Sequence, residues 1–235
     1  MNVIYFDNKN LNEYELYCNG RGTYNAPAKS FEMIQIKGKS GDIPMDNKRF
    51  ENIEITYPSC WIAKDFDDNI SDLKAFLLSR KGYCRLEDTY HPNEFRKAMC
   101  INAMDIDVDM YNKFGSFDLV FNCMPQRFLK TGETTTAFTS NGTINNPTLF
   151  DSKPLIRIYG TGNVGIGSNT ITILEADSYT DIDCELMDAF KGTESKNNKI
   201  RLTNYQFPVL APGNNGVSLG SGITRVEITP RWWTI

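Results

Sequence analysis

The sequence predicts a mainly β protein of two domains with a single α-helix. Short segments in which apolar and polar residues alternate recur along most of the 235 residues, and turn residues separate them. Aromatic residues make up 12% of the chain, which is typical of β-rich proteins. A small, polar stretch at 139–148 divides the chain into two strand-rich halves. We therefore expect an N-terminal domain over 1–142 and a C-terminal β-sandwich domain over 143–235.

The bulk composition narrows the class of protein. A formal net charge of -4 disfavours specific binding to DNA or RNA, whose phosphates repel an acidic chain. The first residues lack the basic start of a signal peptide, and no stretch approaches the roughly 20 apolar residues of a membrane helix. We expect a soluble protein made in the cytosol, with its six scattered cysteines reduced and buried.

The first half begins with predicted strands, and one later segment has its apolar residues at helical spacing instead. Strands are expected at 31–36 and 53–57, with a polar turn at 38–42 between them. Apolar residues then share one face at helical spacing, which predicts a helix over 70–81. Asn69 is placed to cap this helix, and Arg80 and Lys81 suit its C-terminal dipole.

Strand patterns resume after this helix and continue to the end of the chain. In the first half these strands are expected to wrap the helix into one unit, and they lie at 83–87, 99–110 and 117–123. In the second half a polar segment at 191–199 is expected to be a mobile loop, and a Gly-Asn-Asn-Gly turn at 213–216 is expected before the last strand. The other strands of the second half are expected at 155–159, 170–174, 180–186 and 200–202.

One glycine motif has the spelling of a dinucleotide-binding fingerprint. Gly160-Thr161-Gly162-Asn163-Val164-Gly165 matches Gly-x-Gly-x-x-Gly and follows a predicted strand. A phosphate site also needs a helix directly after the motif, and residues 169–173 are β-branched and alternating instead. We interpret the motif as a glycine-rich hairpin and expect no cofactor.

Three carboxylates alternate in one segment of the first half. Asp105, Asp107 and Asp109 resemble the start of a calcium loop. Met110 and Ser116 stand where such a loop requires glycine and glutamate. We favour a strand with acids on its wet face and assign no metal site, although these three carboxylates could hold a cation weakly.

Catalytic patterns are sparse in this chain. His91 is the only histidine, so any histidine-based triad must use it, and it precedes Pro92 in a polar turn. Acid pairs at 175 and 177, and at 181 and 183, could in principle serve a glycosidase. Acids two residues apart on exposed strands are usually solvated, so we predict a protein that is not an enzyme and has no catalytic residues.

The chain ends in a tryptophan pair. Neighbouring residues of a strand point to opposite faces, so one of Trp232 and Trp233 is expected in the core. The other is a candidate contact for a partner or a sugar. A carbohydrate-binding module that grips host cell-wall saccharide through this aromatic is therefore the alternative function.

Two segments near the end carry a family resemblance. Phe207-Pro208-Val209-Leu210-Ala211-Pro212-Gly213-Asn214-Asn215 and Ile228-Thr229-Pro230-Arg231-Trp232-Trp233 match a Pro-x-Leu-x-Pro-Gly-x-Asn pattern and a closing Pro-Arg-Trp pattern. With the turn at 38–42, the predicted helix and the segments at 86–88 and 95–98, the chain resembles the distal tail proteins of long-tailed, non-contractile phages.

The resemblance implies an architecture and a set of partners. It implies an N-terminal β-sandwich-type domain that carries one helix and forms a ring, and a C-terminal galectin-like β-sandwich. Six copies would form a hub in the virion tail, assembled in the host cytoplasm, between the tail tube protein and a tail-tip lysin or fibre protein. Some members also anchor receptor-binding proteins. DNA would pass through the lumen without specific binding.

Overall fold

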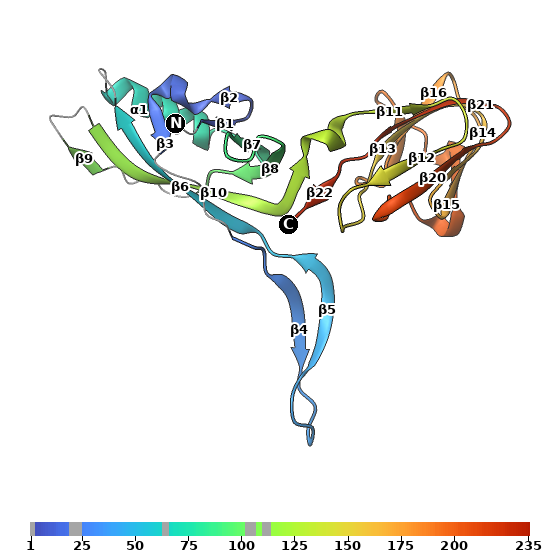
Figure 1. Ribbon diagram of the computed structural model, residues 1–235, viewed down its shortest axis with the longest axis horizontal. Coiled ribbons are helices and arrows are strands. Elements are labelled where there is room, and N and C mark those ends of the chain that lie inside the picture. The colour runs from blue at the N-terminus through green and yellow to red at the C-terminus, as the bar shows by residue number, and fades with distance from the viewer. Residues whose placement is uncertain (1–2, 19–24, 63–65, 102–106, 110–113) are drawn as a thin grey trace. The chain divides into compact units, whose positions relative to one another are not determined.

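The computed structural model describes residues 3–18, 25–62, 66–101, 107–109 and 114–235, and it divides into two compact units (Figure 1). The first unit comprises Met1–Arg127 with Ile235, and the second comprises Phe128–Thr234. The two domains predicted from the sequence, over 1–142 and 143–235, stay a prediction.

The first unit is built on one antiparallel sheet with the strand order β2-β1-β7-β8-β10-β6-β3, and β9 also pairs with β10. Its longest ladder joins β6 and β10, in register from Ile53 opposite Cys123 to Ile62 opposite Phe114. Alternate residues of this ladder enter the core, as a half-buried sheet requires. The strands are β1 (Ile4–Phe6), β2 (Lys9–Asn10), β3 (Leu16–Cys18), β6 (Ile53–Ile62), β7 (Cys84–Asp88), β8 (Glu94–Met99), β9 (Asp107–Asp109) and β10 (Phe114–Leu129).

One α-helix, α1 (Phe66–Leu78), occurs in the described part of the chain. Leu73, Phe76 and Leu77 bury its apolar face in the core of the first unit, together with residues of a short 3-10 helix, η1 (Leu11–Tyr14). The prediction of a helix was right, but its bounds were wrong by three to four residues at each end. Arg80 lies beyond the helix, where it pairs with Asp7 at 2.9 Å and covers the Phe76 ring at 4.4 Å.

Two strands of the first unit form a separate sheet. β4 (Lys29–Ile34) and β5 (Ile43–Phe50) pair only with each other among the described residues. Figure 1 shows them as a long hairpin with no other strand along either outer edge. The strand predicted at 31–36 is found at Lys29–Ile34, and its apolar side chains are exposed, because no other strand or helix of the described residues pairs with it or covers it.

The second unit is a β-sandwich, as predicted. One sheet has the order β11-β21-β13-β16-β17-β18, and the other has the order β12-β20-β14-β15-β19. Isoleucine and valine side chains from both sheets fill the space between them. The strands are β11 (Thr136–Phe138), β12 (Gly142–Asn146), β13 (Leu155–Gly160), β14 (Gly162–Ile166), β15 (Asn169–Ile173), β16 (Tyr179–Asp183), β17 (Asp188–Lys191), β18 (Glu194–Ser195), β19 (Ile200–Leu202), β20 (Gly213–Leu219) and β21 (Ile223–Thr229), with 3-10 helices at Lys130–Glu133, Asn197–Lys199 and Thr203–Tyr205. The short last strand, β22 (Trp233–Thr234), belongs to neither of these sheets and pairs with β10.

Two local predictions for the second unit were wrong. The predicted turn at 213–216 belongs to β20, because Asn215 bonds through its side chain to both backbone groups of Ala211 and closes the turn earlier. The predicted loop at 191–199 contains β18 and a 3-10 helix. Lys196 orders it by pairing with Asp177 at 3.0 Å and Glu194 at 2.7 Å.

The glycine motif marks the crossing between the two sheets of the sandwich. Gly160 ends β13 and Gly162 begins β14, so the motif crosses from one sheet to the other. The predicted hairpin lies one connection later, between β14 and β15. Gly160 has φ +100, and a Cβ there would lie 2.1 Å from the carbonyl oxygen of Gly222. Close backbone approach, rather than phosphate binding, explains this glycine.

Gly160→Ala is expected to destabilise the second unit by about 3 kcal/mol, because it combines backbone strain with a clash against a main-chain oxygen. Gly192 offers the matched control. It has φ +60 but open space around it, so Gly192→Ala should cost only about 1 kcal/mol. Urea denaturation of both variants measures the difference. Equal losses would show that the close approach does not contribute.

Candidate functional site

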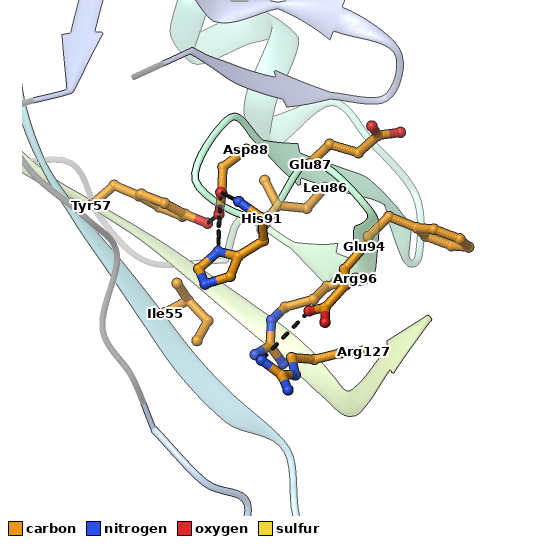
Figure 2. A pocket seen from close by; sticks show the side chains of 10 residues that line it. Ile55, Tyr57, Leu86, Glu87, Asp88, His91, Glu94, Arg96 and Arg127 are labelled. Carbon is orange, nitrogen blue, oxygen red and sulfur yellow. Dashed lines mark hydrogen bonds and ion pairs between the residues drawn. The ribbon is translucent and has the colours of Figure 1, made fainter. Parts of the chain in front are cut away.

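A small cavity in the first unit is the place where charged side chains converge (Figure 2). Its volume is about 30 Å³, which is room for about one water molecule. Strands β6, β7, β8 and β10 and the β7–β8 turn supply its walls. The lining residues are Ile55, Tyr57, Leu86, Glu87, Asp88, His91, Glu94, Phe95, Arg96 and Arg127.

Asp88, at the end of β7, is the centre of one hydrogen-bond cluster. Its carboxylate accepts from the Tyr57 hydroxyl at 2.8 Å and from the His91 backbone N–H at 2.8 Å, and His91 Nδ1 lies 3.1 Å away. Burial, and then the charge of Asp88, raise the pKa of Tyr57 well above its usual value. Tyr57 therefore stays a neutral donor.

A second cluster lies beside the first and carries two guanidinium groups. Arg127 Nη1 lies 3.5 Å from Glu94 Oε2, and burial lowers the pKa of Arg96. Glu94 Oε2, Arg96 Nη1 and Arg127 Nε are buried and make no hydrogen bond within the described chain. The negative charge of Glu94 offsets part of the positive charge of the two arginines. This cluster joins β8 to β10, but its polar groups are incompletely paired.

The geometry of the cavity favours packing over chemistry. His91 is oriented by a carboxylate, as in a triad, but no serine, threonine or cysteine lines the cavity. The space is also too small for a substrate. Sequence reasoning missed the contact between Tyr57 and Asp88 because the two residues are 31 positions apart and no local pattern links them.

The carboxylates considered for glycosidase chemistry are paired with basic side chains. Asp181 and Asp183 are each 5% exposed, so the expectation that they are solvated was wrong. Arg157 bonds both oxygens of Asp181 at 2.7 and 2.9 Å, and Arg231 bonds both oxygens of Asp183 at 2.8 Å. Burial opposes the charge of Asp183, yet the hydrogen bonds from Arg231 and two backbone N–H groups hold its pKa below the usual value. A glycosidase acid needs a raised pKa.

The candidate contact residues lie at the end of the second unit. Trp232 is 5% exposed and belongs to the core, as expected for one of the pair. Trp233 stacks on Phe150 with ring centroids 4.4 Å apart, and its Nε1 donates to the Asp151 carbonyl at 2.9 Å. Packing within the folded unit therefore accounts for the position of both rings. A role for either ring in partner or sugar binding stays a prediction.

The acidic segment of the first unit is only partly described. Asp107 and Asp109 lie in β9, which pairs with β10 as an alternating strand should, and Asp105 lies outside the described residues. Across the described ranges, no group of three or more histidine, cysteine, aspartate or glutamate side chains is arranged to hold a metal ion. The six cysteines are free, and all but Cys84 are buried. No described helix is long and apolar enough to span a bilayer.

Comparisons with known proteins identify the fold. The structure matches the Dit (gp 19.1) protein of phage SPP1, described as a paradigm of the hub adsorption apparatus of phages that infect Gram-positive bacteria, with a TM-score of 0.77. The match covers 100% of both chains at 14% sequence identity. A chain of the phage P2 baseplate in its activated conformation with calcium also matches, with a TM-score of 0.46, 11% identity and coverage of 96% of this chain and 97% of that one. No family model and no curated protein matches the sequence.

The two units therefore define a mainly β fold with one helix, of the class found in phage tail hubs. More particularly, the chain has the fold of a distal tail protein over its whole length. The resemblance inferred from the closing Pro-Arg-Trp pattern is confirmed at the level of the fold.

Proposed function

We propose that this chain is a non-enzymatic structural protein of a phage tail, which serves as the hub between the tail tube and the tail-tip apparatus. One observation carries the proposal: the fold matches a hub protein from end to end, so both units have a counterpart there. A match to one unit alone would support a common sandwich and nothing more.

The geometry of the polar side chains supports a structural role. Asp181 and Asp183 are each held by an arginine, and the cavity beside His91 has room for about one water molecule. The hub would act by self-association and by docking. Its partners would be the tail tube protein on one side and a lysin or fibre protein on the other, with receptor-binding proteins as further partners.

The proposed assembly is a ring of six copies in the virion tail, put together in the host cytoplasm. A ring built from an acidic chain would let DNA pass without gripping it, because like charges repel. Acidic side chains of the first unit would line the passage, and a strongly basic channel in the assembled ring would contradict this part of the proposal.

Native mass spectrometry of the purified chain tests the copy number. The expected result is a dominant species with six times the 26.7 kDa mass of the chain. A chain that stays monomeric at every concentration tested, and also when mixed with tail tube protein, would contradict the proposal.

A further inference from the structure

The β-sandwich of the second unit has a groove at one edge. The sheet β12-β20-β14-β15-β19 ends at β19, and no described strand pairs with the outer side of that strand. The groove at this edge has a volume of about 770 Å³, which lies within the range of ligand-binding clefts. The lining residues are Met187, Asn197, Ile200, Arg201, Leu202, Asn204, Tyr205 and Phe207.

Strand β19 directs main-chain groups toward this groove. The Leu174 N–H donates to the Lys199 carbonyl at 2.9 Å, and the register of β15 with β19 continues this pairing along the strand. In an antiparallel ladder, opposite residues alternate between hydrogen-bonded and non-bonded pairs. Arg201 therefore bonds toward β15, whereas Ile200 and Leu202 turn their N–H and C=O groups toward the outer edge.

The core of the second unit reaches the groove. Ile200, Leu202 and Phe207 pack against the buried core residues but are only half-buried themselves. Two further lining residues are more exposed, Met187 at 66% and Tyr205 at 96%. A strand laid beside β19 would therefore add its apolar side chains to the open side of the core.

Arg201 gives the edge a charge that nothing in the described chain balances. It lies between Ile200 and Leu202 on the opposite, outer face of the sheet, and it makes no ion pair with a described residue. Its neighbour across the ladder, Thr172, is uncharged and donates to Asn163 at 2.8 Å. An acidic residue opposite Arg201 on an added strand would supply the missing charge.

We infer that β19 binds an extended segment of another protein as an added antiparallel strand. Three residues of that segment, apolar, acidic and apolar in order, would lie opposite Leu202, Arg201 and Ile200. In such contacts the main-chain hydrogen bonds supply affinity, and the side chains supply specificity. The inference goes beyond the proposed hub and does not depend on a ring.

Two other occupants fit the groove less well. A second copy that paired its own β19 here, centred on Arg201, would place two guanidinium groups opposite each other, and like charges at that position are destabilising. A saccharide could stack on the exposed ring of Tyr205. It lacks the regularly spaced N–H and C=O groups that match a strand edge, however.

A displayed library of seven-residue peptides, with the three central residues varied, tests the inference. The wild type is expected to enrich apolar–acidic–apolar sequences. Arg201→Glu should enrich apolar–basic–apolar ones, because the preferred charge reverses. Lys153→Glu changes an exposed cation outside the groove and should keep the wild-type preference. The absence of an enriched pattern on the wild type, or the same pattern on Arg201→Glu, would overturn the inference.

Titration with the peptide enriched by the wild type shows whether the main chain carries the contact. N-methylation at the two apolar positions removes the N–H groups that face β19, so binding should weaken at least about 10-fold. N-methylation at the acidic position, whose N–H points away, should have a much smaller effect. Equal binding of the two methylated peptides would contradict strand addition. Arg201→Glu should weaken binding of the unmethylated peptide about 5-fold.

Native mass spectrometry separates this inference from the proposed hub, because Arg201→Glu should keep the copy number of the wild type. A wild type that forms rings but binds no peptide overturns the inference alone. A wild type that binds the peptide but forms no ring overturns the hub alone. Glycan-array binding that Tyr205→Ala abolishes, with no peptide enriched, would overturn the inference in favour of a saccharide.

Discussion

Arg231→Ala is expected to destabilise the second unit by about 3–5 kcal/mol, because it leaves the buried carboxylate of Asp183 without its partner. Arg231 supplies two hydrogen bonds to that carboxylate, and the two backbone N–H groups that remain cannot neutralise its charge. Arg231→Lys keeps the charge but loses the bidentate geometry, so it should restore part of the loss.

An exposed ion pair in the same unit gives the control. Lys199 pairs with Glu175, and their side chains are 37% and 63% exposed. Lys199→Ala should therefore cost no more than about 1 kcal/mol. Guanidinium denaturation of the three variants measures the free energies of unfolding. A loss for Arg231→Ala no larger than that for Lys199→Ala would show that the pair does not hold the second unit together.

The pH dependence of the same variant has a definite sign. The pKa of Asp183 is lowered in the folded protein, so its stabilising contribution is present above the ordinary aspartate value of about 3.9 and is lost as the pH falls through the folded value. Without Arg231, burial raises this pKa instead. The difference between wild type and Arg231→Ala should therefore shrink when unfolding is measured below about pH 4. A difference independent of pH would contradict the role of charge.

Phe121→Ala is expected to destabilise the first unit by about 3–5 kcal/mol, because the ring is 0% exposed and its removal leaves a cavity. The Phe121 ring lies 5.0 Å from the Phe6 ring and 6.2 Å from the Tyr57 ring. Its removal therefore takes away a contact that joins β10 to β1 and β6. Phe31→Ala is the control, because Phe31 is 46% exposed and its removal should change monomer stability by less than about 0.5 kcal/mol.

Calorimetry of these variants also tests the two-domain organisation predicted from the sequence. If the two units unfold separately, Phe121→Ala should lower the midpoint of one transition and Arg231→Ala that of the other. A single transition that both variants shift equally would show that the chain unfolds as one cooperative body.

Most of the fold follows from local patterns in the sequence. Alternation identified the strand that contains Ile55 and the one that contains Phe121, and period 3.6 identified the helix around Leu73. Errors arose where a side-chain contact that no periodic pattern encodes decides the local structure. Asn215 moves a turn by bonding to Ala211, and Lys196 orders a segment that is polar enough to look mobile.

The charged residues show the same limit more clearly. Spacing made Asp181 and Asp183 look like solvated neighbours, yet each is buried against an arginine that is 24 or 48 positions away. Arg231 belongs to the Pro-Arg-Trp pattern that carried the family resemblance. The structure gives this pattern a physical reason, since Arg231 pairs with Asp183 and Trp232 fills the core.

The exposure of the β4–β5 hairpin could not be predicted from the sequence. Its first strand has the apolar content of a core strand, and only the pairing of β4 with β5 alone shows that nothing in the described chain covers it. A pattern of apolar residues indicates that a surface will be buried, but it does not say whether the same chain or another one buries it.

Electron micrographs of the purified, negatively stained protein test the proposed hub most directly. The predicted class averages show a closed ring of six copies around a central pore, with six lobes at its periphery. Separate two-lobed particles at every concentration, with no ring among them, would contradict the proposal.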